Sequence, residues 1–210
     1  MAPAFRALIG GLPRWFALGA GGFVGALAWL AVPAGLWILA PRLPEGPDAL
    51  AVLAGGLGLG WIAPKLPYLQ ARFALERSWP ALWDVRAVTR RFRRAPFAFV
   101  AGLAVTLAGS FPLFLLKIEL APREVAWLAC VFFVVFAFPA RLATGWALRR
   151  AEVREADASF AWRWIMRGGA AALGVFYAFT LYFTQFLSWR GAWSFLEQHA
   201  FLTPAPWLGF

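Results

Sequence analysis

The sequence predicts an all-helical, polytopic transmembrane bundle of about five spans, and three observations lead to this class. Of the 210 residues, 62% are apolar and 14% are charged, whereas a soluble domain is about half apolar and roughly a quarter charged. The apolar residues gather in long runs that approach or exceed the ~20 residues needed to cross the hydrocarbon core. The basic residues lie mainly between these runs, as in membrane proteins with short loops.

The expected spans are residues 16–40, 49–66, 96–116, 125–148 and 168–189, within a single integral-membrane domain that covers residues 1–210. The first run is too long for a signal peptide, whose apolar core is ~7–15 residues, so we expect it to be retained. The second run is short. It reaches spanning length only if Lys65 extends to the membrane surface and Leu66 and Pro67 lie at the interface.

The distribution of basic residues predicts the orientation. Residues 65–95 hold eight of the twenty basic residues, and with five spans sixteen of the twenty fall on the same side as this segment. The positive-inside rule then predicts a cytoplasmic N-terminus and an outside C-terminus. A net charge of +10 would indicate nucleic-acid binding in a polar domain. Because these charges lie between hydrophobic runs, orientation explains them better, and we expect no nucleic-acid partner.

Part of the basic segment has the pattern of an amphipathic helix that begins near Pro80, a residue suited to a first helical turn. Its apolar stripe consists of Leu82, Val85, Val88 and Phe92, and its opposite face carries Arg86, Arg90, Arg93 and Arg94. Such a helix would lie among the lipid headgroups on the cytoplasmic face. It would act either as a topology anchor or as a docking surface for anionic lipids or an acidic partner.

Small residues at helical spacing predict close helix contacts within the membrane. These residues are Gly21, Gly25, Gly56, Gly60, Gly102, Thr106 and Ser110. A polar stripe on the last span consists of Tyr177, Thr180, Thr184 and Gln185, and should face protein rather than lipid. Arg141, near the end of the fourth span, is expected to extend to the interface; the alternative is a functional charge that faces the bundle interior.

We expect no catalytic site, cofactor or metal. The chain has a single cysteine, Cys130, and a single histidine, His199, which makes a zinc site implausible. Ser194 and Glu197 complete the residue types of a hydrolase triad with His199, but adjacent tail residues rarely supply its geometry. No span contains a central Asp, Glu, Lys or His, which counts against ion-coupled transport.

Short motifs between residues 116 and 147, namely LKIE, PRE, WL, FPARL and GWA, resemble uncharacterised polytopic inner-membrane proteins of bacteria. The resemblance covers about a third of the chain. It implies a bacterial cytoplasmic membrane and transfers no activity and no site residue.

The function that these observations favour is a non-catalytic subunit or scaffold of a membrane complex. Its expected partners are anionic lipid headgroups and other membrane subunits or further copies of the chain. The alternative is a small permease or lipid-handling protein, with a cavity lined by the kinked spans and the polar stripe. A third hypothesis, an intramembrane enzyme, depends only on Ser194 and His199.

Overall fold

The structure, a computed structural model, describes residues 2–118 and 126–187. Every regular element in these ranges is helical, and they contain no strand, so the all-helical class is confirmed. The elements are α1 (Ala2–Leu39), η1 (Ala40–Arg42), α2 (Pro47–Ile62), α3 (Leu66–Glu76), η2 (Trp79–Leu82), α4 (Val85–Arg94), α5 (Pro96–Ile118), α6 (Ala126–Val153) and α7 (Phe160–Leu187).

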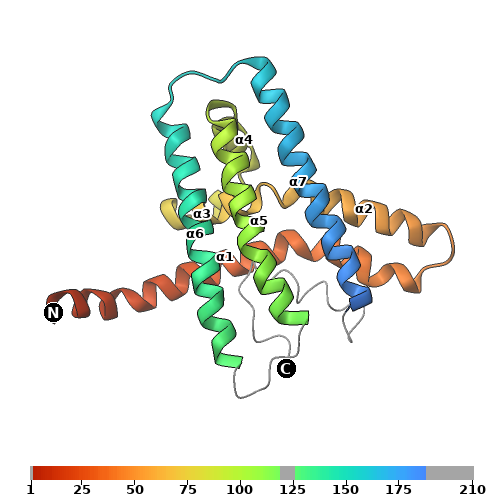
Figure 1. The fold of residues 1–210 in the computed structure, drawn as a ribbon, viewed down its shortest axis with the longest axis horizontal. Coiled ribbons are helices and arrows are strands. Elements are labelled where there is room, and N and C mark those ends of the chain that lie inside the picture. Colours follow the sequence, from red (N-terminus) through yellow and green to blue (C-terminus); the bar gives the residue numbers. More distant parts are fainter. Residues whose placement is uncertain (1, 119–125, 188–210) are drawn as a thin grey trace.

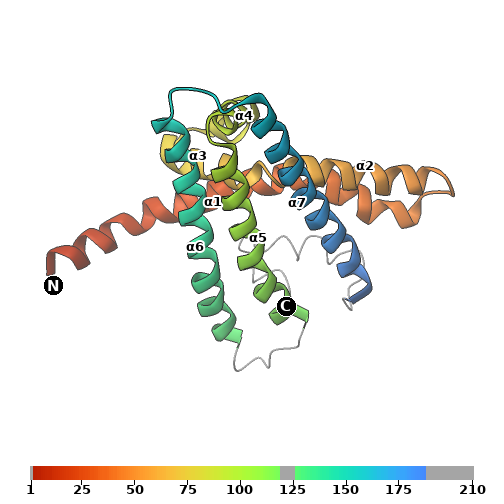
Figure 2. The same cartoon turned by 45° about the horizontal axis from the view of Figure 1, so that its top comes forward.

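The long helices form two layers that cross steeply instead of one parallel bundle (Figures 1 and 2). One layer is the antiparallel hairpin of α1 and α2, and the other consists of α5, α6 and α7. The short helix α3 packs against α1 and α6 and so joins the layers, while α4 packs on α5 and α6 at one end of the second layer.

Two of the described helical segments, Pro13–Arg42 and Phe160–Phe183, are long and apolar enough to cross a membrane. A third span is possible if α2 and α3, which meet at a bend of 46°, count as one broken span. The described apolar part of α5, Pro96–Ser110, is shorter. The structure therefore supports two or three membrane-spanning segments by length and composition.

Local sequence signals define the α1–α2 hairpin. Gly46 adopts a positive φ of 98°, which glycine tolerates at no steric cost, and Pro47 follows in the first turn of α2. The carboxylate of Asp48 accepts hydrogen bonds from the amides of Gly46, at 2.9 Å, and Ala49, at 2.6 Å. Because α1 begins at Ala2, the N-terminal segment and the first expected span belong to one helix.

The helix of the second expected span, α2, ends at Ile62. Leu66 and Pro67 begin α3 and are buried inside the protein, with Leu66 0% exposed. The chain bends after α2 and continues as α3, whose residues Leu69 and Tyr68 are also buried. The Tyr68 hydroxyl donates to the carbonyl of Phe99, and the two rings stack with centroids 4.3 Å apart. These contacts place α3 at the centre of the core.

The basic amphipathic helix begins at Val85 and not near Pro80, which lies in the separate 3₁₀ turn η2. Asp84 sets the start of α4, because its carboxylate accepts a hydrogen bond from the amide of Ala87 at 2.9 Å. The helix ends at Arg94. Pro96 disfavours a helical conformation for the preceding Ala95, which has φ −134° and ψ 56°.

Candidate membrane-surface site

The two most basic segments of the chain meet at one end of the molecule. The amide of Ala158, in the α6–α7 connection, donates to the carbonyl of Arg93 at the end of α4, at 2.9 Å. Arg154 donates to the carbonyl of Arg94 at 3.4 Å. These contacts join segments that are about sixty residues apart in the sequence. We call the surface formed by α4, the end of α6 and the start of α7 the basic end.

The four arginines predicted to form a docking surface are all exposed on α4. Arg90 and Arg94 line a groove of about 280 Å³ that α4 forms with the end of α6. Arg93 lines a second groove, of about 250 Å³, with Arg163 of α7. Arg86 borders neither groove. The predicted surface is therefore completed by residues of α6 and α7.

The apolar stripe of α4 packs on the protein itself. Leu82 and Val88 are buried, and Val85 and Phe92 are half-buried. The ring of Phe92 meets that of Phe99 on α5 edge to face, with centroids 5.9 Å apart. The stripe is thus covered by the ends of the long helices, and the arginines on the other face remain available to a membrane surface.

A buried arginine that the sequence reading missed holds α3 and α4 together. Arg72, 6% exposed, binds both carboxylate oxygens of Glu76 through two hydrogen bonds of 2.9 and 3.0 Å. It also donates to the carbonyl of Asp84 at 3.2 Å. Such two-pronged pairs are among the stronger hydrogen bonds in proteins. Arg91 reaches the same Glu76 at 3.7 Å and Glu152 of α6 at 3.9 Å, which extends the network to the basic end.

The charge network also acts on Asp84. The hydrogen bond from the amide of Ala87 is the main cause that lowers the pKa of this carboxyl, and the charges of Arg72 and Arg90 add to it. The folded state therefore favours the carboxylate form of Asp84, which is the form that caps α4.

A second polar chain crosses the core from α1 to α6. Gln70 of α3, which is buried, donates to the carbonyl of Gly22 on α1 at 3.1 Å. Its side-chain oxygen accepts a hydrogen bond from Arg141 on α6 at 2.8 Å. Arg141 is itself exposed, so its guanidinium contacts Gln70 from the surface of the protein. Gln70 could not be identified from the sequence, because its partners are distant in the chain.

The predicted small residues lie at several helix contacts. A Cβ atom added at Gly21 would come within 2.6 Å of the Phe73 ring, and one at Gly25 within 2.7 Å of Leu82. Gly60 lies against Gly174 of α7. A Cβ atom added at Gly174 would come within 2.5 Å of the Gly60 carbonyl oxygen. Gly174 was absent from the predicted set.

The remaining small residues differ in their surroundings. A Cβ at Gly102 would come within 2.8 Å of the Tyr68 hydroxyl, whereas one at Gly56 would make ordinary contact with Trp37 at 3.6 Å. Thr106 and Ser110 are buried, and each hydroxyl donates to a carbonyl of its own helix, at 2.8 and 2.6 Å.

The predicted polar stripe on α7 is only partly in the interior. Tyr177 is buried, Gln185 is half-buried, and the Thr180 hydroxyl donates to the carbonyl of Phe176 in its own helix at 2.8 Å. The Thr184 side chain lies outside the described part of the structure, as do the Cys130 side chain and the tail residues Ser194, Glu197 and His199.

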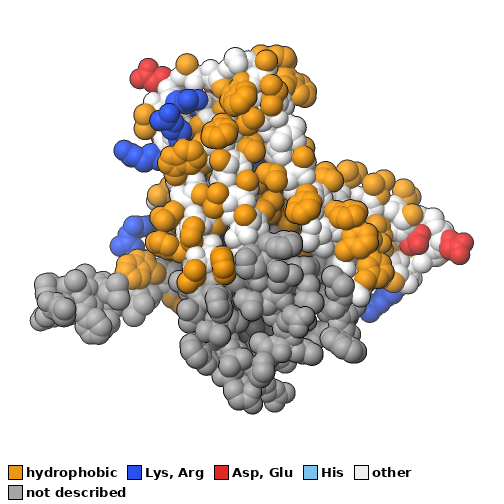
Figure 3. All heavy atoms as spheres, in the orientation of Figure 1, with side chains coloured by type: hydrophobic (Ala, Val, Ile, Leu, Met, Phe, Trp, Pro, Cys, Tyr) orange, Lys and Arg blue, Asp and Glu red, His pale blue; other side chains and the backbone are white. Residues whose placement is uncertain are grey.

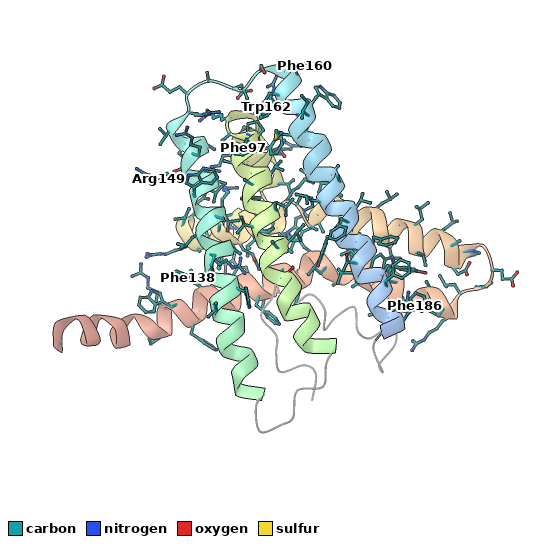
Figure 4. All side chains as sticks on the ribbon, in the orientation of Figure 1. Phe97, Phe138, Arg149, Phe160, Trp162 and Phe186 are labelled. Carbon is teal, nitrogen blue, oxygen red and sulfur yellow. The ribbon has the colours of Figure 1, made fainter. Side chains whose placement is uncertain are left out.

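Aromatic side chains border the basic end. Figure 4 shows Phe160 and Trp162 at the start of α7, at the same end of the second layer as Arg149 on α6, with Phe186 at the opposite end of α7. Phe160 and Trp162 are exposed. The Arg167 guanidinium lies over the Trp164 ring, 5.5 Å from its centroid. Exposed aromatic rings beside arginines are typical of the boundary between the hydrocarbon and the headgroups of a membrane.

A cavity of about 270 Å³ lies behind the basic end, where α2, α3, α4, α5 and α7 converge. Its wall is mostly apolar. Two cationic side chains line it: Lys65, from the turn between α2 and α3, and Arg167, from α7. Among the described residues, no carboxylate lies within ion-pair distance of either cation. In the same ranges, no cluster of three or more His, Cys, Asp or Glu side chains is placed to hold a metal ion.

Comparison of the chain with protein-family models, with curated proteins and with solved structures finds no match.

Proposed function

We propose that this chain is a multi-pass integral membrane protein of the bacterial cytoplasmic membrane that acts as a non-catalytic subunit or scaffold. The observation that carries the proposal is the separation of charge from apolar surface. Most of the described arginines lie at the basic end, and bulky apolar side chains cover much of α2, α5, α6 and α7 on the visible face (Figure 3). A soluble protein rarely exposes so continuous an apolar surface.

The exposed apolar side chains follow the outer faces of the helices. On α7 they include Val175, Phe176, Phe179 and Phe186, each more than half exposed. On α6 they include Val135, Phe138, Leu142 and Trp146, each at least half exposed. Such rows fit lipid tails or the apolar helix of a second membrane protein, because neither offers hydrogen-bonding groups that would need to be matched.

The orientation in the proposal places the basic end at the cytoplasmic surface. Arginines near the surface of an anionic leaflet each contribute about 1 kcal/mol of attraction. The aromatic residues at the start of α7 then lie at headgroup depth, and the apolar faces below them lie in the hydrocarbon. The N-terminus is proposed to be cytoplasmic and the C-terminus outside, with about five spans.

The crossing of the two layers bears on the number of spans. Membrane helices tilt by ~20° on average, with a range of 0–40°. Helices that cross steeply therefore cannot all stand upright in one bilayer. Five upright spans would require the α1–α2 hairpin to turn relative to α5, α6 and α7, which would break the close contact between Gly60 of α2 and Gly174 of α7. With that contact kept, the arrangement fits two or three spans.

Affinity isolation of the tagged chain from membranes in a mild detergent tests the scaffold proposal. We expect a stoichiometric complex that contains either a second membrane protein or further copies of the chain. Replacing exposed Phe179 and Phe183 on α7 by Ala should weaken that complex, while replacing Val24 and Val32 on α1 by Ala serves as the matched control. A purified chain that is monomeric and carries no other protein would contradict the proposal.

A second candidate function, lipid handling, is favoured by one specific observation. The cavity behind the basic end combines an apolar wall with two cations that have no carboxylate partner among the described residues. That combination matches an amphiphile with a negative headgroup.

A further inference from the structure

We propose that the cavity behind the basic end binds one anionic phospholipid, with its phosphate between Lys65 and Arg167 and the first part of an acyl chain against the aromatic wall. The inference rests on the proposed membrane location and names a ligand for this site. It concerns a single defined site, distinct from the general attraction of the exposed arginines to a charged leaflet.

Lys65 reaches the cavity from the turn between α2 and α3, and Arg167 reaches it from α7; among the described residues neither has a carboxylate partner. The Lys65 ammonium donates to the carbonyl of Trp61 and lies over the Trp61 ring, 4.2 Å from its centroid. The Arg167 guanidinium lies over the ring of Trp164. Both side chains are half-buried. Contacts with aromatic rings fix the positions of these cations without supplying an anion, so a phosphate would supply the counter-charge that the described residues do not.

The apolar wall provides the complementary part of the site. It includes Trp61, Phe92, Phe99 and Leu103. Two polar groups, the Thr89 hydroxyl and the Tyr68 hydroxyl, also belong to the lining, and both already donate to backbone carbonyls, Thr89 to Val85 at 2.9 Å and Tyr68 to Phe99. Lys65 and Arg167 are therefore the lining groups that would bind a charged headgroup.

The size of the cavity limits what it encloses. At about 270 Å³ it is near the lower end of the ~300–1,000 Å³ range of small-molecule sites. It can hold a phosphate, part of the glycerol and a short length of chain, and the remaining tails would extend outside it. A soluble anion would leave the apolar wall exposed to water, and a neutral lipid would leave two cations without a counter-charge.

Native mass spectrometry of the detergent-purified chain, equilibrated with phosphatidylglycerol or with phosphatidylcholine, tests the proposal. We expect one phosphatidylglycerol to be retained more tightly than the others, and no such molecule of phosphatidylcholine. Lys65→Gln with Arg167→Gln should weaken retention of that lipid by about tenfold or more, since each charge near a phosphate contributes appreciably. Lys65→Arg with Arg167→Lys should keep it, which separates loss of charge from loss of fold.

The matched control is Arg86→Gln with Arg90→Gln, which removes two charges from the basic end outside this cavity. It should leave the single tight lipid in place. Leu103→Trp, which places a larger side chain in the cavity, should also abolish retention of the lipid although both charges remain.

Retention of one phosphatidylglycerol by Lys65→Gln with Arg167→Gln, at the wild-type affinity, would overturn the lipid site and leave the scaffold proposal untouched. Equal retention of phosphatidylcholine and phosphatidylglycerol by the wild-type chain would overturn it as well. Failure of the scaffold proposal would instead appear as a monomer in mild detergent that still retains its tight lipid.

Discussion

The amide of Ala158 donates a hydrogen bond to the carbonyl of Arg93, at 2.9 Å, and thereby ties the α6–α7 connection to the end of α4. Arg93 belongs to the first basic segment, and Ala158 lies in the second. A membrane protein whose orientation follows its arginines must keep such segments on one side of the bilayer. The hydrogen bond keeps the two segments side by side in the fold, as the proposed orientation requires.

The contact between Gly60 and Gly174 predicts that α7 tolerates no side chain at this crossing. Gly174→Ala would place a Cβ 2.5 Å from the Gly60 carbonyl oxygen and 2.9 Å from Cγ of Pro64. Because the first atom belongs to the backbone, α2 and α7 must move apart, and we expect a loss of about 1–3 kcal/mol of stability. Thermal unfolding in detergent, followed by circular dichroism, measures this loss.

Gly168→Ala, on the same helix, is the matched control. No atom lies within 4 Å of its added Cβ. Alanine is the better helix former, so this variant should be neutral or more stable by up to ~1 kcal/mol. Equal destabilisation by the two substitutions would show that the close crossing of α2 and α7 is wrong.

Because the guanidinium of Arg72 is buried and paired, we expect that removing its charge lowers the stability of the fold. Arg72→Met keeps most of the apolar stem but loses both hydrogen bonds to Glu76 and the one to the Asp84 carbonyl. Glu76 and Asp84 are more than a third exposed and can be solvated, so we expect a loss of about 1–3 kcal/mol rather than more. Arg86→Met, at an exposed position on α4, should change stability by no more than ~0.5 kcal/mol. Similar unfolding temperatures for the two variants would contradict the buried network.

The lowered pKa of Asp84 predicts a pH dependence with a defined sign. A carboxyl whose pKa is lower in the folded state stabilises the fold above its ordinary value of 3.8, and this stabilisation disappears as the pH falls through the folded pKa. Asp84→Asn keeps a side chain that can cap α4 but cannot carry the charge. The stability difference between wild type and Asp84→Asn should therefore be constant between about pH 5 and 7 and shrink below about pH 4. A difference that grows on acidification would contradict the assignment.

The connection between α1 and α2 provides a test of the number of spans. Glu45 is exposed in this connection. If the hairpin crosses the membrane, a cysteine at Glu45 in a chain that lacks Cys130 should react with a membrane-impermeant maleimide from the outside of intact spheroplasts. Reaction only in inverted vesicles would show that α1 and α2 do not form a pair of spans, and would reduce the number of spans from about five to three.

The all-helical class and the face of α4 could be predicted from the sequence because both are local patterns. Long apolar runs indicate helices, and the spacing of Val85, Val88 and Phe92 identifies the face that packs inward. The start of α4 could also have been predicted, since Asp84 directly precedes Val85 and aspartate is a favoured cap. We placed the start too early because Pro80 is equally suited to a first turn.

The central helix α3 could not be predicted in the same way. Gln70, Arg72 and Glu76 make its sequence look like a polar loop beside the apolar runs. Burial of Gln70 and Arg72 is possible only because each finds a partner, and the partners of Gln70 lie 48 and 71 positions away in the chain. Hydropathy predicts apolar helices, but it does not predict the angle at which the two layers cross, because that angle is set by contacts between distant segments such as Gly60 and Gly174.

Labelling of single cysteines at Arg86 and Glu155, in a chain with Cys130 replaced by Ala, tests the central claim most directly. Both positions are exposed, one on α4 and the other in the α6–α7 connection. We expect an impermeant maleimide to modify both in inverted membrane vesicles and neither in intact spheroplasts. Modification of one position from each side of the membrane would contradict the account.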